Sequence, residues 1–141
     1  GQAMKLYGEL AGPSQLSDDQ SGLEKWREIL SHLGTTVFCV EQDGLLLGLT
    51  TLHVLPNVTY HGRSYALIEN VVTLKTQQKS GIGKLLMNHV IDHAWQQDCY
   101  KIMLLTGKNA GAKGFYQRLG FSDDEKLGMT MRRIPTRQNL E

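Results

Sequence analysis

Disulfides, membrane spans and an export signal are all missing from this sequence. Cys39 and Cys99 are its two cysteines, too few for a disulfide framework and typical of thiols in a reducing compartment. No run of 18 apolar residues occurs, so we predict no membrane-spanning helix. The N-terminus shows no basic region followed by an apolar stretch, so we predict no signal peptide and expect a cytoplasmic protein.

The sequence also lacks an excess of charge of either sign. Its 15 Lys and Arg residues against 14 Asp and Glu residues leave a net charge of +1. This balance gives no basis for binding nucleic acid or an anionic membrane surface. With 40% hydrophobic and 21% charged residues, the composition is that of an ordinary globular protein. A length of 141 residues predicts a single domain over 1–141.

Hydrophobic spacing predicts two helices ahead of the first strand. The first covers residues 4–11 and is stopped by Gly12 and Pro13. The second has apolar residues at intervals of three and four, which form one helix face. Gly34 is predicted as its C′ residue. The residues of that apolar face are Leu23, Trp26, Leu30 and Leu33.

Three strands are predicted next. Residues 36–40 are rich in β-branched and aromatic side chains, and Asp43-Gly44 is a strong hairpin signal. Residues 45–55 form the return strand, with Gly48 as a candidate bulge. Residues 65–74 have the continuous apolar character of a central strand.

The remaining elements alternate between helix and strand. A helix begins at about Gly81, a short apolar strand covers 101–105, and Asn109 opens a further helix that Gly120 ends. Residues 129–131 are predicted as a last strand. This order predicts an α+β fold, with a mixed, mostly antiparallel sheet and helices on both faces.

The most informative segment is a glycine-containing turn between a predicted strand and a predicted helix. Its glycines allow close approach of a ligand to the backbone, and the first N–H groups of a helix have no partner within the helix. Together with the helix dipole, these groups form an anion site. The segment, with a lysine on each side of its glycines, therefore indicates a phosphate-bearing ligand. It consists of Gln78, Lys79, Ser80, Gly81, Ile82, Gly83 and Lys84.

Two common phosphate motifs do not fit this turn. A Walker A loop needs Ser or Thr after Gly-Lys, but Leu85 follows Lys84. A dinucleotide fingerprint needs a third glycine, and Leu86 stands at that position. On the residues of the turn alone, a structural glycine turn without a ligand remains an equally good interpretation.

The turn resembles the signature Q/R-x-x-G-x-G/A of the GNAT family of N-acetyltransferases. A second family motif, N-x-x-A-x-x-F-Y-x-x-x-G-F, matches residues 109–121 at the expected distance downstream. Two motifs separated by a predicted strand are far more specific than either one. The resemblance covers about residues 20–131. Family members usually begin with a strand ahead of the first helix. This sequence begins inside that helix, at about Met4, so the strand is absent, unusually short or outside the given sequence.

The resemblance implies an acetyl-CoA site built on a splayed pair of parallel strands. Their expected ranges are 70–74 and 101–106, and backbone near Val72 would face the thioester oxygen. The N–H groups of residues 79–84 would bind the pyrophosphate. The residues implied in cofactor binding are Val71, Val72, Thr73, Gln78, Lys79, Ser80, Gly81, Ile82, Gly83, Lys84, Asn109 and Tyr116.

The resemblance also implies two catalytic side chains. Tyr116 matches the family's usual general acid, and Glu69 matches the position of a base in several members. Each has a structural alternative: Tyr116 as a core residue of an amphipathic helix, and Glu69 as a strand residue paired with Arg63. Asn109 either contacts the pantetheine arm or caps its helix. His53, Tyr65 and Trp26 are weaker candidates for the acceptor pocket.

Other readings of the sequence are weaker. His89 and His93 are four apart on one helix, but the Glu of a zinc-binding H-E-x-x-H motif is missing, so we predict no metal site. The leading function is acetyl transfer from acetyl-CoA to a primary amine of a small molecule. The alternatives are a catalytically silent acyl-CoA-binding module and a protein or peptide acetyltransferase. The resemblance is compatible with a homodimer, because GNAT proteins are often dimers, but the sequence itself does not indicate the oligomeric state.

Overall fold

The computed structural model describes residues 1–17 and 19–134, which divide into two compact units. The first unit is Gly1–Leu104 and the second begins at Leu105. The first unit holds the whole sheet and four of the α-helical segments, whereas the second holds one short helix.

The first unit begins with two helices, as predicted. Helix α1 is Gln2–Ala11, a 3-10 turn η1 covers Pro13–Gln15, and α2 is Asp19–Ser31. The predicted apolar face of α2 is only partly buried, because Leu23 and Leu30 remain 45% and 57% exposed. Gly34 has a left-handed φ of 79°, but it lies in the turn before the first strand and is not the C′ residue of α2.

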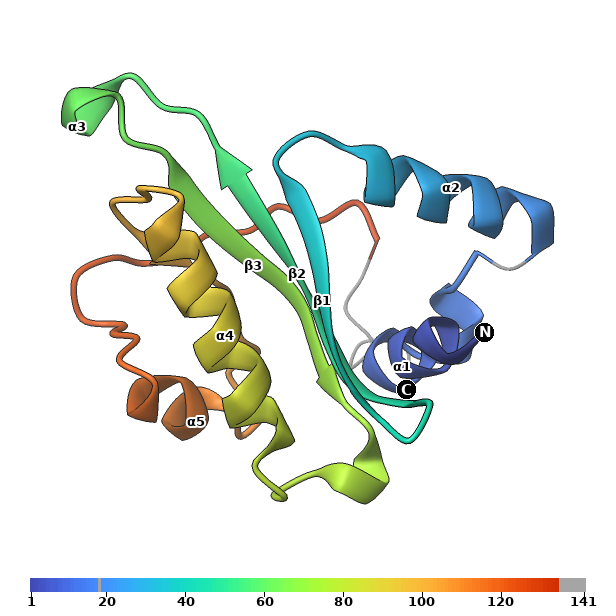
Figure 1. Ribbon diagram of the computed structural model, residues 1–141. Coiled ribbons are helices and arrows are strands. Elements are labelled where there is room, and N and C mark those ends of the chain that lie inside the picture. Colours follow the sequence, from blue (N-terminus) through green and yellow to red (C-terminus); the bar gives the residue numbers. More distant parts are fainter. Residues whose placement is uncertain (18, 135–141) are drawn as a thin grey trace. The chain divides into compact units, whose positions relative to one another are not determined.

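The sheet has the strand order β1-β2-β3-β4. Strands β1 (Thr35–Gln42), β2 (Leu45–Leu55) and β3 (Tyr65–Thr73) are antiparallel, and β4 (Ile102–Met103) is parallel to β3. The predicted mixed sheet is therefore confirmed. Figure 1 shows α1 and α2 on one side of this sheet and α4 (Ile82–Gln96) on the other.

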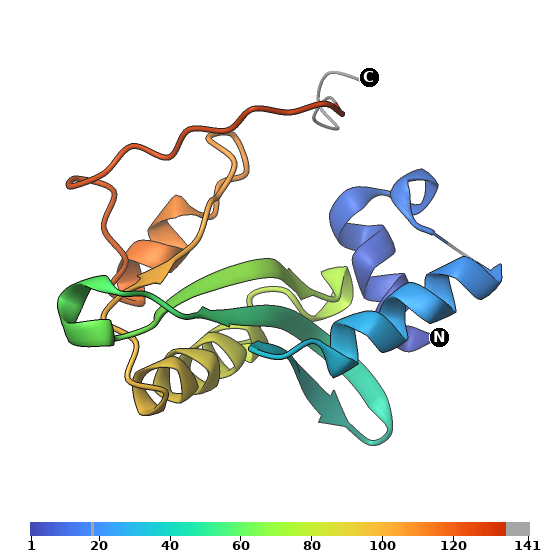
Figure 2. The ribbon, with the colours of Figure 1, turned by 90° about the horizontal axis from the view of Figure 1, so that it is seen from above.

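Two predictions for the β1–β2 hairpin are confirmed. Asp43 and Gly44 have φ values of 52° and 77°, as a type I′ turn requires. The register shifts where Val40 pairs with Gly48 and Glu41 pairs with Leu46, so the strand is irregular beside Gly48. The hairpin turn and the short α3 segment (Thr59–Gly62) between β2 and β3 lie at opposite ends of the sheet (Figure 2).

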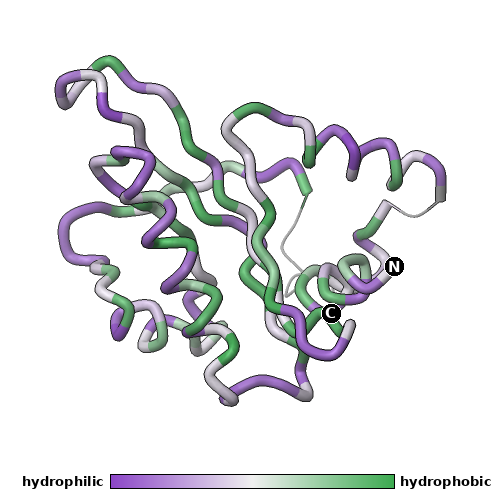
Figure 3. Tube along the Cα trace, viewed as in Figure 1, coloured by the Kyte–Doolittle hydropathy of each residue, from purple (hydrophilic) through white to green (hydrophobic). Residues whose placement is uncertain are grey.

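The core of the first unit lies between the sheet and its helices. Hydrophobic residues gather along β2 and β3, while much of α2 is hydrophilic (Figure 3). Apolar residues four positions apart form the inner face of α4, since Leu86, Val90 and Ala94 are buried. The same burial fixes α4 on the sheet and so fixes where its N-terminus lies.

The second unit corrects two predictions. Its helix α5 is Lys113–Arg118, so Asn109 lies in a turn before the helix and does not open it. Residues 129–131 form no strand in the structure, and Met129 and Met131 are 92% and 102% exposed. Alternating apolar residues favour a strand, but a strand also needs a hydrogen-bonded neighbour, and none of the described strands pairs with this segment. Gly120, with φ of 100°, follows α5 as predicted.

Candidate functional site

The glycine turn connects β3 to α4 through a short 3-10 segment, η2 (Lys75–Gln77). Gly81 is the N-cap of α4 with a left-handed φ of 89°, and Lys79 also has a positive φ of 62°. An added Cβ at Gly81 would meet no atom within 4 Å, so this position favours glycine for its backbone angle and not for lack of space. The predicted strand–turn–helix arrangement is therefore present.

The N-terminus of α4 leaves backbone donors unpaired within the helix. Its first helical bond runs from the Leu85 N–H to the Gly81 carbonyl at 3.0 Å, and no side chain caps the end. The preceding N–H groups of residues 82–84 therefore have no partner one helical turn back. With the positive end of a 15-residue helix behind them, these groups can bind an anion.

Neighbouring elements fix the start of this turn. The carboxylate of Glu9, on α1, accepts a hydrogen bond from the Lys75 N–H at 2.9 Å. The Leu74 N–H donates to the Leu47 carbonyl at 2.9 Å. The Ser80 hydroxyl donates to the Gln77 carbonyl, which folds the turn on itself. The turn is thus held by α1 and by β2 before the chain enters α4.

The C-terminal half of β3 is open on the side of β4. Only Ala66 and Leu67 of β3 pair with β4, at Ile102 and Met103, among the residues that the structure describes. Beyond Leu67, β3 continues for six residues to Thr73 without a β4 partner. The predicted splayed parallel pair is confirmed in this form, with a second strand much shorter than the expected 101–106. Backbone N–H and C=O groups along the open edge can pair with an extended amide-bearing ligand.

A bulge interrupts β3 within this open half. Thr51 pairs with Glu69 and Leu49 pairs with Val72, so two residues of β3 stand opposite one of β2. Asn70, the first of the two, has a positive φ of 56°. Gly48 lies close to the bulge, because an added Cβ there would be 3.0 Å from the Val72 carbonyl oxygen. The backbone therefore changes direction just before Val72, where a donor to the thioester oxygen is expected.

Glu69 is exposed on the strand face that α1 and α2 cover. Its cross-strand partner is Thr51, and its backbone carbonyl accepts a hydrogen bond from the Thr50 hydroxyl at 3.0 Å. Arg63, the alternative partner, forms an ion pair with Asp98 at 3.3 Å instead. No ion pair of Glu69 occurs within 1–17 and 19–134, so its carboxylate is available to a ligand.

The remaining two predicted site residues belong to the second unit. Tyr116 lies on α5 with its ring centroid 5.2 Å from that of Phe115 and 6.1 Å from that of Phe121. Burial among such groups raises the pKa of the Tyr116 phenol, because it disfavours the phenolate. A neutral phenol is the form that can donate a proton. Asn109 lies in the turn before α5.

Two residues that the sequence interpretation did not single out, Tyr7 and Thr51, lie on the same side of the sheet as Glu69. Tyr7 of α1 makes a side-chain hydrogen bond with Thr51, and its ring contacts Trp26 of α2 at 5.9 Å between centroids. Burial raises the pKa of Tyr7, although the bond with Thr51 acts in the opposite direction. The alternation of side chains along β2 could have indicated this face, because Thr51 and His53 are two residues apart and therefore point to the same side of the sheet.

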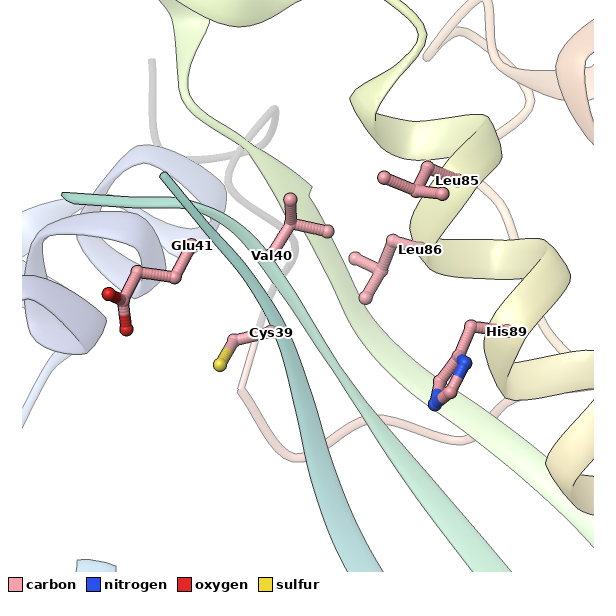
Figure 4. A pocket seen from close by; sticks show the side chains of 6 residues that line it. All are labelled: Cys39, Val40, Glu41, Leu85, Leu86 and His89. Atoms are coloured by element: carbon pink, nitrogen blue, oxygen red, sulfur yellow. The ribbon is translucent and has the colours of Figure 1, made fainter. Parts of the chain in front are cut away.

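A hollow of about 320 Å³ lies between β1 and α4 and contains none of the predicted site residues. In Figure 4, Val40 faces Leu86 and His89 of α4, whereas Cys39 and Glu41 point away from that helix. His89 and His93 both contact the Phe38 ring, at centroid distances of 5.5 and 5.1 Å. The described part of the chain has no cluster of three potential metal ligands. It also has no helix long and apolar enough to span a bilayer.

The comparisons with known proteins agree on one family. The model of the acetyltransferase (GNAT) family matches residues 4–121, a range that includes the glycine turn and α5. A glucosamine 6-phosphate N-acetyltransferase of Trypanosoma brucei brucei is 32% identical over 92 residues. That alignment covers 65% of this chain and 61% of the relative, so the chain matches less than two thirds of that protein.

Solved structures share the fold. A putative acetyltransferase from Agrobacterium tumefaciens str. C58 is 36% identical with a TM-score of 0.86, over 94% of this chain and 92% of the other. A glucosamine-6-phosphate N-acetyltransferase from Arabidopsis thaliana has a TM-score of 0.77 over 95% of both chains. Its identity is 20%, so this second likeness concerns the fold alone.

Proposed function

The chain belongs to the GNAT family of acetyltransferases, and we propose that it transfers the acetyl group of acetyl-CoA to the primary amine of a small molecule. The observation that carries this proposal is the combination of an open β3 edge with an uncapped α4 N-terminus at the end of the same strand. The open edge of β3 suits an extended chain of amides, and the uncapped N-terminus of α4 suits a pyrophosphate. Coenzyme A contains both groups in one molecule.

The cofactor-binding residues follow from this arrangement. Backbone of Val71, Val72 and Thr73 would pair with the pantetheine amides. The turn from Gln78 to Lys84 would hold the pyrophosphate, with Lys79 and Lys84 adding positive charge. The GNAT family uses acetyl-CoA as its cosubstrate, which supports the same assignment. Asn109 would contact the pantetheine arm, as the family motif implies. Its position in the turn before α5 is compatible with this role.

Three groups would perform the chemistry of direct transfer. Glu69 would take a proton from the acceptor ammonium, so that the neutral amine attacks the thioester carbonyl. A backbone N–H near Val72 would stabilise the tetrahedral oxyanion, which is worth about 3 kcal/mol per donor in other enzymes. Tyr116 would protonate the leaving thiolate, a role supported by the family motif and by the raised pKa of its phenol.

The acceptor would bind on the face of the sheet that α1 and α2 cover. Glu69 is exposed on this face, and its cross-strand partner Thr51 is hydrogen-bonded to Tyr7, whose ring contacts Trp26. The relatives named as glucosamine 6-phosphate N-acetyltransferases make an amino sugar phosphate the first acceptor to test. A small amine suits this face better than a protein segment, because α1 and α2 cover part of it.

The test is release of free CoA from acetyl-CoA with a panel of amines. The panel contains glucosamine 6-phosphate, glucosamine, amino acids, polyamines and a lysine-containing peptide. Turnover with a small amine, accompanied by its acetylated product in a mass spectrum, supports the proposal. Acetyl-CoA binding without CoA release above background would favour a silent binding module, and turnover with the peptide alone would favour a protein acetyltransferase.

A further inference from the structure

Two histidines in the first unit, His32 and His53, are held by one hydroxyl group and form a histidine pair. The Thr35 Oγ1 lies 2.8 Å from the His32 Nδ1 and 2.9 Å from the His53 Nδ1. His32 follows α2, Thr35 begins β1, and His53 lies on β2. Because each ring is held through its Nδ1, both Nε2 atoms remain without a partner among residues 1–17 and 19–134.

The histidine pair lies on the same face of the sheet as the proposed base. The pairs Thr51–Glu69 and His53–Leu67 are adjacent in the register of β2 and β3, so His53 and Glu69 are diagonal neighbours. Side chains in that relation are about 7 Å apart. His53 is half-buried and His32 is exposed, so a ligand that contacts Glu69 can also reach the pair.

The shared hydroxyl determines what the two Nε2 atoms can bind. A hydroxyl group has one proton to donate and two lone pairs to accept with. When both rings are neutral, one Nδ1 donates to Thr35 and the other accepts from it, so only one Nε2 carries a proton. When the pair gains one further proton, both Nε2 atoms become donors and the pair has a positive charge. In that state it can hold an anion through two hydrogen bonds.

The carboxylate beside His32 is already paired with a lysine. Glu28, four residues earlier at the end of α2, interacts electrostatically with His32. The same carboxylate forms an ion pair with Lys25, three residues earlier on the helix. Since the two charges of that ion pair offset one another, the histidine pair remains available to an anion from a ligand.

Charge changes sign along β3 on either side of His53. Tyr65 is the second diagonal neighbour of His53, because Tyr65 pairs with Leu55. The Lys101 Nζ lies 5.4 Å from the centroid of the Tyr65 ring. The Glu69 carboxylate and this ammonium group therefore flank the position of His53. Such an arrangement favours a ligand with its amine at Glu69 and its anionic group at His53.

We propose that the histidine pair binds a phosphate group of the acceptor while Glu69 binds its amine. This inference rests on the proposed function and specifies its substrate class, a primary amine with a phosphate about 7 Å away. An α-amino acid does not fit, because its amine and carboxylate are attached to one carbon. An amino sugar phosphate does fit, because a sugar ring separates the two groups.

The first test compares two acceptors that differ only in the phosphate. The wild-type protein should have a kcat/KM about thirtyfold higher with glucosamine 6-phosphate than with glucosamine, the range expected for a hydrogen bond to a charged group. His53→Ala should lower this ratio about tenfold, mainly through the KM of the phosphorylated acceptor. His53→Arg keeps a positively charged donor and should retain most of the ratio.

A control histidine lies on the other side of the sheet. His89 is exposed on α4, which covers the face opposite to α1 and α2 (Figure 1). His89→Ala removes the same side chain as His53→Ala and should leave the ratio between the two acceptors unchanged. A fall of the ratio in both variants would indicate a general effect of losing a histidine and would overturn the phosphate site.

Thr35 is a positioning residue in this proposal, because it acts through the two rings. Thr35→Val removes the hydroxyl that orients them and should lower the ratio between the acceptors about fivefold, whereas Thr35→Ser keeps the hydroxyl and should retain it. Thr36→Val, at the exposed neighbouring residue, controls for the change to the strand. Equal ratios in Thr35→Val and Thr35→Ser would exclude the positioning role.

A second measurement does not depend on activity. In nitrogen-15 NMR spectra, glucosamine 6-phosphate should move the ring signals of His32 and His53 toward the values of the charged imidazolium. Glucosamine at the same concentration should leave them in place, and the signals of His89 should not respond to either compound. Ring signals of His32 and His53 that do not respond to the phosphorylated compound would exclude the site.

The outcomes separate this proposal from the proposed function. Equal kcat/KM for the two acceptors, or turnover of other amines without turnover of glucosamine 6-phosphate, would overturn the phosphate site and leave acetyl transfer intact. A higher acetyl-CoA KM in His53→Ala with an unchanged acceptor ratio would assign the pair to the cofactor and also overturn it. Absence of CoA release with every amine would refute the proposed function, and the NMR titration would still decide whether the pair binds phosphate.

Discussion

The two halves of β3 belong to one continuous strand but have different surroundings. In the first half, Ala66 and Ile68 are 0% and 2% exposed, and Ala66 and Leu67 have strand neighbours on both sides. In the second half, from Glu69 to Thr73, the β4 side is open and a bulge at Asn70 breaks the pairing with β2. The closed half contributes buried residues to the core, and the open half continues toward the glycine turn.

This difference indicates a division of roles along one strand. Burial and pairing on both sides stabilise the fold, whereas unpaired backbone costs stability unless water or a ligand satisfies it. We therefore expect changes in the closed half to lower stability, and changes in the open half or the glycine turn to lower binding and catalysis. Four substitutions test this expectation.

The largest effect should come from the closed half. Ile68→Ala removes a buried side chain and should lower the free energy of unfolding by about 3 kcal/mol, within the range for such truncations. Val71→Ala, at a half-buried position of the open half, should lower it much less. Urea unfolding measures both. Equal losses at the two positions would remove the distinction between the halves.

The next effect concerns the glycine turn. Gly83→Asp places a carboxylate beside the proposed pyrophosphate site and should weaken acetyl-CoA binding about a hundredfold, or about 2.7 kcal/mol. Asn88→Asp adds the same charge at an exposed position further along α4 and should leave the Kd nearly unchanged. Calorimetry gives both constants. An unaltered Kd for Gly83→Asp would refute the assignment of this turn.

The third substitution tests Tyr116, a proposed catalytic residue that lies outside β3. Tyr116→Phe should lower kcat about thirtyfold, as expected for loss of a general acid, while the acetyl-CoA KM changes little. Because burial raises the pKa of Tyr116, the active protonated form should persist as the pH rises past the usual tyrosine value of about 10. The loss of wild-type kcat at high pH should therefore lie above that value.

The controls for Tyr116 are kinetic. The alkaline loss of kcat should disappear in Tyr116→Phe, because phenylalanine does not titrate. Tyr60→Phe, at an exposed tyrosine of the first unit, should match the wild type. Retention of kcat by Tyr116→Phe to within about twofold would exclude Tyr116 as the acid.

The smallest effect is expected at the first residue of the open half. Glu69→Gln should lower the rate about tenfold at acidic pH, where the amine is protonated, and less at alkaline pH. Glu41→Gln, at an exposed position of β1, is the matched control. A ratio of mutant to wild-type rate that does not vary with pH would indicate that the enzyme captures free amine from solution.

Sequence reasoning succeeded where neighbouring residues decide the structure. The Asp43-Gly44 turn, the inner face of α4 and the strand–turn–helix around Gly81 were all predictable from turn chemistry and spacing. It failed at residues 129–131, which alternate like a strand, and at Asn109, which resembles a helix cap. At residues 129–131 no strand of the described chain pairs with the segment, and at Asn109 the helix begins only at Lys113, four residues later.

The sequence by itself determined the family, the glycine turn and the candidate residues, because motifs and turn preferences depend on side chains a few positions apart. Only the tertiary structure decided that β4 stops after two pairs, that β3 bulges at Asn70, and that Thr35 joins two histidines. These features depend on strand register, which is set by contacts between residues far apart in the chain. The open edge of β3 is therefore a property of the fold, even though the turn that follows it is a property of the sequence.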